Sequence, residues 1–152
     1  MKTLPFKIRD YHDAYHFWDK SENLGLSGAD SREGIKKYLK RNPGLSLIVR
    51  DRGAIVGTVL CGHDGRRGYL HHLAVASEYR GKGIGRSLVN TCLDALKAQD
   101  IRKCHIFIFQ ENRAGMDFWH SISWVKREDV EIYSHDIDFP GGGLDPFPDF
   151  HA

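Results

Sequence analysis

Cysteine is scarce in this sequence, and long apolar runs are missing from it. The three cysteines, Cys61, Cys92 and Cys104, form no C-x-x-C pair and are too few for a disulfide scaffold. Each lies in an apolar stretch, where a free thiol behaves as a small hydrophobic side chain. No stretch approaches the ~18 apolar residues of a membrane span, and the N-terminus lacks the apolar segment of a signal peptide. We therefore expect a cytoplasmic protein that has no membrane partner.

An excess of one charge is also missing. Lysine and arginine number 22 against 20 aspartates and glutamates, which gives a net charge of +2. Such nearly equal numbers of positive and negative side chains argue against nucleic acid as the partner. The composition is that of a globular protein, with 41% hydrophobic and 28% charged residues. A chain of 152 residues is long enough for one domain with a hydrophobic core.

Hydrophobic periodicity predicts helices first and a β-meander after them. A short strand at 6–9 precedes a helix over 11–18, and a second helix follows Ser31 and ends at Asn42-Pro43-Gly44. Turn residues then separate segments rich in β-branched side chains. These segments predict three antiparallel strands at 45–50, 54–61 and 69–75.

The second half of the chain predicts a long amphipathic helix and shorter elements after it. The helix carries Ile84, Leu88, Cys92 and Leu96 four residues apart. A continuous apolar run at 104–109 is typical of a strand buried on both faces. The remaining expected elements are a helix at 113–120 and strands at 124–127 and 130–134.

The C-terminal segment has a different composition. Residues 138–152 hold three of the five prolines, three phenylalanines and the run Gly141-Gly142-Gly143. Such a segment does not form regular structure by itself. We therefore divide the chain into a domain at 1–137 and a tail at 138–152, and we expect the tail to pack on the domain or on a second subunit.

The segment Arg80-Gly81-Lys82-Gly83-Ile84-Gly85 stands between a predicted strand and the long helix. Backbone N–H groups and the helix dipole make a helix N-terminus a binding site for anions. Glycines let a large anionic group approach the backbone, and Arg80, Lys82 and Arg86 add positive charge. This combination predicts a site for a pyrophosphate.

Two familiar phosphate-binding motifs fit this segment poorly. A P-loop requires Ser or Thr after its lysine, whereas Gly83 follows Lys82 here. A dinucleotide-binding fingerprint lies in a parallel βαβ unit, whereas this segment follows an antiparallel meander. The remaining pattern, R-G-x-G-x-G some five residues after a strand that ends Leu73-Ala74-Val75, resembles the coenzyme A motif of the GNAT acyltransferase superfamily.

A second segment adds to this resemblance. Glu111-Asn112 and Phe118 match the superfamily pattern E-N-x-x-A-x-x-F-Y-x-x-x-G-F, whereas Gly115, Trp119, Ser123 and Trp124 depart from it. The resemblance covers roughly residues 4 to 135 and is strongest for bacterial members related to the ribosomal-protein N-terminal acetyltransferases. It implies an α+β (mixed α/β) fold in which a twisted, mainly antiparallel sheet is flanked by helices and splays between its fourth and fifth strands.

The resemblance also implies a cosubstrate, acetyl-CoA, and the residues that bind it, with no metal. Strand backbone would pair with the pantetheine arm, the glycine segment would hold the pyrophosphate, and two residues of the second segment would complete the site. These residues are Leu73, Ala74, Val75, Arg80, Gly81, Lys82, Gly83, Ile84, Gly85, Arg86, Asn112 and Trp119.

The activity that the resemblance implies is direct attack of a primary amine on the thioester in a ternary complex. The backbone N–H of Val75 or of a neighbouring residue would donate to the developing oxyanion. Strand alternation puts Tyr69 and His71 on one face and His72 on the other, and it argues against a metal shared by the two histidines. An imidazole titrates near neutral pH, so His71 is our preferred general base, with Tyr69 beside it.

Trp119 stands where many members of the superfamily have a tyrosine that protonates the leaving thiolate. An indole N–H is no acid at neutral pH, so Tyr79, Tyr133 or water is left to supply this proton.

The alternative function is an acyl-CoA-binding regulatory module without turnover. The acceptor, a small amine or a peptide or protein N-terminus, stays open, and the tail suggests a homodimer.

Overall fold

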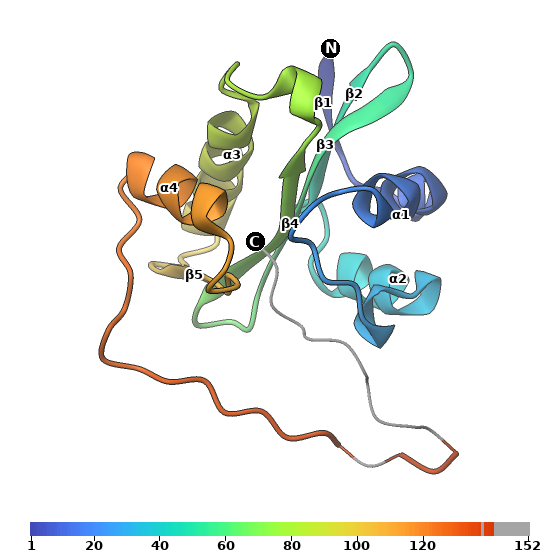
Figure 1. The fold of residues 1–152 in the computed structure, drawn as a ribbon. Helices are drawn as coiled ribbons and strands as arrows, with labels where there is room; N and C mark the ends of the chain where they lie inside the picture. The colour runs from blue at the N-terminus through green and yellow to red at the C-terminus, as the bar shows by residue number, and fades with distance from the viewer. Residues whose placement is uncertain (138, 142–152) are drawn as a thin grey trace.

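The computed structural model describes residues 1–137 and 139–141 and contains one five-stranded sheet with helices on both faces (Figure 1). The first strand, β1 (Lys2–Pro5), leads through a helical turn at Ile8–Asp10 into α1 (Tyr11–Asp19). A second turn at Gly28–Asp30 precedes α2 (Arg32–Arg41). Ser31 caps α2 by accepting a hydrogen bond from Gly34 N, as its place before the amphipathic run predicted.

The sheet order is β1-β2-β3-β4-β5. Strands β2 (Leu47–Asp51), β3 (Ala54–His63) and β4 (Gly68–Val75) form the predicted meander, and β1 pairs with β2. After a turn at Ser77–Tyr79 come the remaining elements, which are α3 (Ile84–Ala98), β5 (Cys104–Ile106) and α4 (Arg113–Ser121). The predicted α+β fold class with a mainly antiparallel sheet is confirmed.

Two cores lie on opposite faces of the sheet. Trp18, Ile35 and Ile48 belong to the core beneath α1 and α2. Leu70, Leu88 and Trp119 belong to the larger core beneath α3 and α4. This separation of the helices is visible in Figure 1, where β4 runs between the two layers and ends beside the N-terminus of α3.

Strands β4 and β5 are parallel neighbours, and they pair only between Gly68–Leu70 and Cys104–Ile106. The expected strand at 104–109 is therefore wrong in length, and β5 is half-buried rather than enclosed on both faces. Over Leu73–Val75, beyond this short ladder, β4 makes no strand pairing with β5 in the described structure. The predicted splay between the fourth and fifth strands is thus present.

A β-bulge in β4 overturns one sequence prediction. The partner of Thr58 is Ala74 and that of Leu60 is His71, so β4 holds one more residue than β3 over this interval. His72 has a positive φ of 51° there. Its ring lies 4.6 Å from that of Trp18 on α1, while the His71 ring faces Tyr38 on α2. Both histidines therefore point to the same layer of helices, which strict alternation did not predict.

Buried hydrogen bonds hold the bulge. The Thr58 hydroxyl accepts a hydrogen bond from Trp18 Nε1 at 2.9 Å and donates one to the His72 carbonyl at 2.8 Å. His72 Nε2 lies 2.6 Å from Asp30 Oδ1, and the Asp30 carbonyl accepts from the Tyr11 hydroxyl. One network thus connects α1, the turn before α2 and the centre of β4.

Two expected strands are wrong. Residues 124–127 and 130–134 carry strand-like sequence, but 125–137 form neither helix nor strand and are exposed throughout. In Figure 1 this segment leaves α4 and runs away from the sheet. Local sequence pattern cannot supply the partner that a strand needs. The tail predicted at 138–152 lies almost entirely outside the described residues, so the domain division stays a prediction.

We predict that Thr58→Val lowers the free energy of unfolding by about 1–3 kcal/mol, because it leaves a buried indole N–H and a buried carbonyl without this hydroxyl. Urea denaturation followed by circular dichroism measures the change. The matched control is Thr91→Val, which removes an exposed hydroxyl bonded to the Ser87 carbonyl of α3 and should cost less than about 0.5 kcal/mol. Equal losses for both variants would contradict the role given to Thr58.

Candidate functional site

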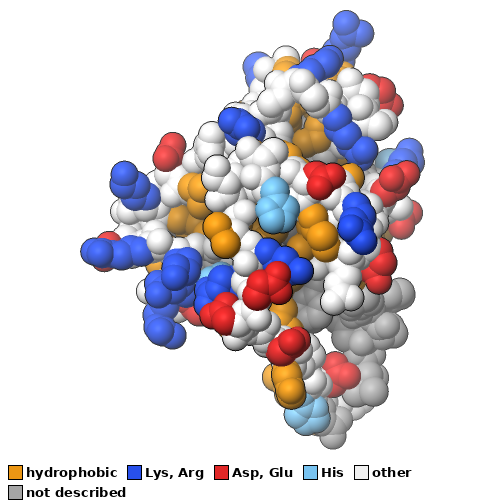
Figure 2. Space-filling model, turned by 60° about the vertical axis from the view of Figure 1, so that its left-hand side comes forward, with side chains coloured by type: hydrophobic (Ala, Val, Ile, Leu, Met, Phe, Trp, Pro, Cys, Tyr) orange, Lys and Arg blue, Asp and Glu red, His pale blue; other side chains and the backbone are white. Residues whose placement is uncertain are grey.

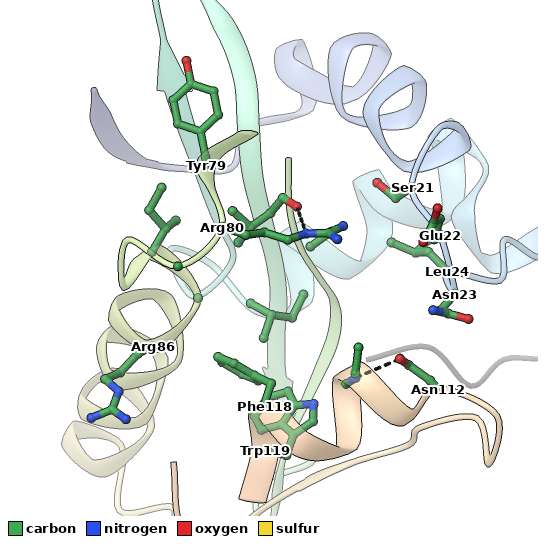
Figure 3. A pocket seen from close by; sticks show the side chains of 18 of the residues that line it. Ser21, Glu22, Asn23, Leu24, Tyr79, Arg80, Arg86, Asn112, Phe118 and Trp119 are labelled. Carbon is green, nitrogen blue, oxygen red and sulfur yellow. Dashed lines mark hydrogen bonds between the residues drawn. The ribbon is translucent and has the colours of Figure 1, made fainter. Parts of the chain in front are cut away.

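A cavity of about 470 Å³ opens where β4 parts from β5. Its walls come from four places in the chain, namely the segment after α1, the second half of β4, the loop into α3, and α4 (Figure 3). The lining residues are Ser21, Glu22, Asn23, Leu24, His72, Leu73, Ala74, Val75, Tyr79, Arg80, Gly81, Gly83, Ile84, Gly85, Arg86, Asn112, Ala114, Gly115, Phe118, Trp119, Ser121 and Ile122. Every residue proposed for coenzyme binding except Lys82 therefore lines the cavity.

The glycine loop forms the cavity wall at the N-terminus of α3. Gly81 and Gly83 have φ values of 76° and 83°, and a Cβ on either would meet nothing within 4 Å. Gly83 is the N-cap of α3, whose first turn holds no acidic residue. Unobstructed backbone and the positive end of a helix dipole thus lie at one edge of the cavity, and this is where an anionic group binds most readily.

Gly85 serves another purpose. Its Cα faces the ring of Phe118, and an added Cβ would lie 3.2 Å from two ring carbons. The glycine therefore lets α3 approach α4 closely across the cavity floor. A side chain at this position would push the two helices apart.

The three cations of the motif point in different directions. Arg80 turns back to the cavity, where its Nε donates a 3.1 Å hydrogen bond to the Val75 carbonyl, as Figure 3 shows. Lys82 places its ammonium 5.3 Å from the centre of the Tyr79 ring, outside the cavity lining. Arg86 lies on the first turn of α3, and its Nη2 is 3.5 Å from the Ser121 carbonyl. All three side chains are exposed.

The end of β4 presents backbone groups to the cavity. Ala76 N donates to the Val56 carbonyl of β3. Because N–H groups of successive strand residues point to opposite sides, the Val75 N–H is directed away from β3, toward the side from which β5 has departed. The Val75 carbonyl points the same way and accepts the bond from Arg80.

Asn112 and Trp119 form part of the opposite wall. Asn112 is the N-cap of α4, and its Oδ1 accepts a 2.9 Å hydrogen bond from Gly115 N. Trp119 is 4% exposed and packs between Phe118 and Trp124, with ring centroids 5.2 and 4.6 Å away. Both side chains thus have a structural role in this wall. Asn112 caps the N-terminus of α4, and Trp119 fills the core beneath the helix.

The candidate base and its neighbour lie beside the cavity, not in its lining. Tyr69 and His71 both stack on Phe107, with centroid distances of 6.0 and 6.3 Å. Burial, reinforced by the adjacent His72, lowers the pKa of His71 to about 4, so its imidazole is neutral at pH 7. His72 does line the cavity, but its side chain is fully buried and bonded to Asp30.

Tyr79 and Tyr133 were the tyrosines left to protonate a thiolate. The Tyr79 hydroxyl donates a 2.6 Å hydrogen bond to Asp51 Oδ2, and this bond raises the pKa of Tyr79. In Figure 3 the ring points away from the cavity centre. Tyr133 is 94% exposed in the segment after α4. Neither hydroxyl is therefore directed at the site.

Sequence reasoning missed the wall made by Ser21, Asn23 and Leu24. In Figure 3 these residues and Glu22 lie on the same side as Asn112, with α3 and Arg86 on the opposite side. They carry no motif that sequence analysis could have singled out. Phe118 was part of the quoted pattern, but its contact with Gly85 requires α4 to be placed against α3, which the sequence did not show.

The surface of the molecule carries mixed charge on one face. On the face shown in Figure 2, lysine and arginine side chains stand beside aspartate and glutamate side chains. None of the helices in the described part of the chain is long and apolar enough to cross a membrane.

Comparison with known proteins identifies the family. The family model described as "Acetyltransferase (GNAT) family" matches residues 8–123. The chain is 26% identical over 132 residues to an acetyltransferase of Photorhabdus laumondii, which covers 87% of this chain and 92% of the relative.

Two solved structures show the same fold. One is the ribosomal-protein-S18-alanine N-acetyltransferase of Escherichia coli, with a TM-score of 0.66, 17% identity and coverage of 80% of this chain and 76% of the other. The other is the PaiA N-acetyltransferase of Thermoplasma acidophilum in complex with coenzyme A, with a TM-score of 0.68, 17% identity and coverage of 86% and 92%. With its glycine loop at the N-terminus of α3 and its open edge of β4, the chain belongs to the GNAT family and is an N-acetyltransferase.

Proposed function

We propose that the protein transfers the acetyl group of acetyl-CoA to a primary amine by direct attack in a ternary complex. The observation that carries this proposal is one cavity that joins the open edge of β4 to the glycine loop of α3. A thioester with a long polar arm and a pyrophosphate needs both features. The GNAT relatives and the coenzyme A complex of a similar fold support the choice of cosubstrate.

The chain's own residues divide the work of binding. Gly81, Gly83 and the first N–H groups of α3 would receive the pyrophosphate, with Ile84 and Gly85 behind them on the helix. Lys82 and Arg86 are exposed and would add positive charge near the pyrophosphate, and Arg80 would add its charge while its Nε stays bonded to the Val75 carbonyl. The backbone of Leu73, Ala74 and Val75 would pair with the pantetheine arm as a missing strand would. Asn112 orders the facing wall by capping α4, and Trp119 packs below it.

Bound acetyl-CoA supplies an activated acetyl group. The Val75 N–H, directed to the open side of β4, would donate to the carbonyl oxygen as negative charge develops there. This donor is fixed by the strand and needs no rearrangement. Arg80 holds the carbonyl of the same residue and so steadies this end of β4.

His71 is our candidate for the general base, with Tyr69 beside it on the same face. Its pKa of about 4 keeps the imidazole unprotonated at pH 7 but also makes it a weak proton acceptor, and the half-buried side chain lies outside the cavity lining. His72 is closer to the cavity but is enclosed and bonded to Asp30. We assign no protein acid to the departing thiolate, because Tyr79 is bonded to Asp51 and Trp119 has no hydroxyl.

The acceptor would enter past the part of the lining that follows α1, which consists of Ser21, Glu22, Asn23 and Leu24. The carboxylate of Glu22 suits an approaching ammonium group. The similar fold of an alanine N-acetyltransferase acting on a ribosomal protein supports a peptide N-terminus as one acceptor class, and a small amine is the other.

We predict that acetyl-CoA binds the unmodified protein and that Gly83→Glu weakens binding at least tenfold, because a carboxylate would stand where the phosphates lie. Isothermal titration calorimetry measures the two dissociation constants. The control is Gly53→Glu in the β2–β3 turn, where φ is 84° and the added side chain also meets nothing within 4 Å. It adds the same charge and strain outside the cavity and should leave affinity unchanged. No binding by the unmodified protein would contradict the proposal.

We predict that His71→Ala lowers kcat by about a hundredfold or more, the usual contribution of a general base, without changing acetyl-CoA affinity. The assay follows release of the coenzyme thiol with a panel of peptides and small amines. His105→Ala is the control, since His105 contacts Tyr69 on the same face at 5.7 Å and has no proposed role. A kcat within about threefold of the unmodified value would remove His71 as the base. Acetyl-CoA binding without turnover on any acceptor would favour the regulatory module instead.

A further inference from the structure

The connection that follows α1 supplies four residues of the cavity lining, yet little of it is packed into the protein. Residues 20–27 form neither helix nor strand, and none of residues 19–29 is buried. The nearest buried side chains stand at its two ends, Trp18 before it and Asp30 after it. Residues 19–29, hereafter the acceptor segment, therefore depend on these two side chains for their position.

Both end residues meet His72 in the bulge of β4. The Trp18 ring lies 4.6 Å from the His72 ring, and Asp30 Oδ1 lies 2.6 Å from His72 Nε2. A carboxylate accepts hydrogen bonds and donates none, so Nε2 carries the hydrogen of this bond. In Figure 1 the connection from α1 to α2 accordingly comes back to the middle of β4 before α2 begins. One side chain of the sheet thus lies against both ends of the acceptor segment.

Asp30 uses its second carboxylate oxygen to hold the segment itself. Its Oδ2 accepts a 2.9 Å hydrogen bond from Ser27 N, while its Oδ1 is bonded to His72. A single buried carboxylate thereby joins the backbone of the acceptor segment to the sheet. Hydrogen bonds to a carboxylate are short and directional, and burial strengthens them. They fix a position that the exposed and half-buried side chains of the segment leave open.

His72 adopts a conformation that is unfavourable for any residue other than glycine. Its φ of 51° lies in the left-handed region, and its polar side chain is fully buried. Such features persist only where the surrounding contacts enforce them, and they cluster at functional sites. His72 lines the cavity, and the next residue, Leu73, begins the stretch of β4 that we expect to pair with the pantetheine arm.

We propose that His72 is a positioning residue for acetyl transfer, which fixes the acceptor segment relative to β4 through Asp30 and Trp18. This inference rests on the proposed function. An amine attacks a thioester efficiently only when the two are held in line at close approach. The backbone of β4 would place the thioester, and the segment that contains Glu22 would place the amine. Because His72 belongs to β4 and holds both ends of that segment, it sets the distance between the two reactants.

The test compares His72→Leu and Asp30→Asn with the unmodified full-length protein. Leucine has no donor for Asp30, and an asparagine has one oxygen for the two donors that the carboxylate accepts. In both variants we expect kcat/KM for the acceptor to fall about tenfold or more, with acetyl-CoA affinity changed by less than about threefold. Coenzyme affinity should persist because Thr58 bonds the His72 carbonyl, which every side-chain variant keeps. If neither variant lowers kcat/KM by more than about threefold, the proposal is wrong.

Two further variants separate positioning from a loss of stability. Ser46→Ala removes another buried hydroxyl, which accepts a 3.0 Å hydrogen bond from Cys61 N outside the cavity lining, and it should leave kcat/KM unchanged. His72→Gln keeps an N–H donor at the end of the side chain and should retain kcat/KM to within about threefold of the unmodified value. A glutamine variant as impaired as His72→Leu would contradict the role of the bond to Asp30. Thermal melts followed by circular dichroism check that each variant is folded.

Hydrogen–deuterium exchange tests the same inference without turnover. We expect the amides of residues 21–29 to exchange about tenfold faster or more in His72→Leu and Asp30→Asn, while those of α3 keep their rates. Unchanged exchange in residues 21–29 would overturn the proposal even if activity fell. Faster exchange in a protein that acetylates no acceptor would contradict the proposed function, but it would support the placement of the segment by His72.

Discussion

The parting of β4 from β5 is the constraint on which the site depends. The two strands pair only as far as Leu70 and Ile106, so the rest of β4 presents backbone to a cavity instead of a neighbouring strand. The bulge at His72 sets how β4 continues, and it is fixed by the Thr58 hydroxyl and by Asp30. Trp18 joins this network from α1. Residues far from the coenzyme motif thus determine the direction in which Val75 points.

The cavity brings together two kinds of backbone site. At one end the N–H groups of a glycine loop and a helix terminus favour negative charge. At the other, the open edge of a strand offers hydrogen bonds to an extended polar chain. Coenzyme A has a pyrophosphate and an amide-containing arm in that order, which is why a cavity of this construction suits it. Side chains such as Arg80 and Asn112 steady the backbone that does the binding.

The sequence predicted those parts of the fold and site that depend on local chemistry. The glycine loop follows from residues that favour positive φ, and the long helix and the meander follow from the turn residues and the spacing of hydrophobic side chains along the chain. The bulge was not predictable, because the extra residue at His72 is a property of the pairing between β3 and β4. Residues 130–134 show the converse case. Their strand pattern is real in the sequence, but a strand forms only when it is paired, and in the described structure this segment pairs with no other strand. The wall at Ser21–Leu24 likewise arises only when α1 is packed against the sheet.

In the proposed complex, acetyl-CoA would lie along the open edge of β4 and over the loop into α3. Amide NMR spectra recorded as acetyl-CoA is added test it most directly. We predict large shifts for the amides of Val75, Gly81 and Gly83, and none for those of Gly53 and Gly65, which occupy turns outside the cavity with the same positive φ. Shifts confined to other parts of the sheet, or unchanged Val75 and Gly83 amides at saturation, would contradict it.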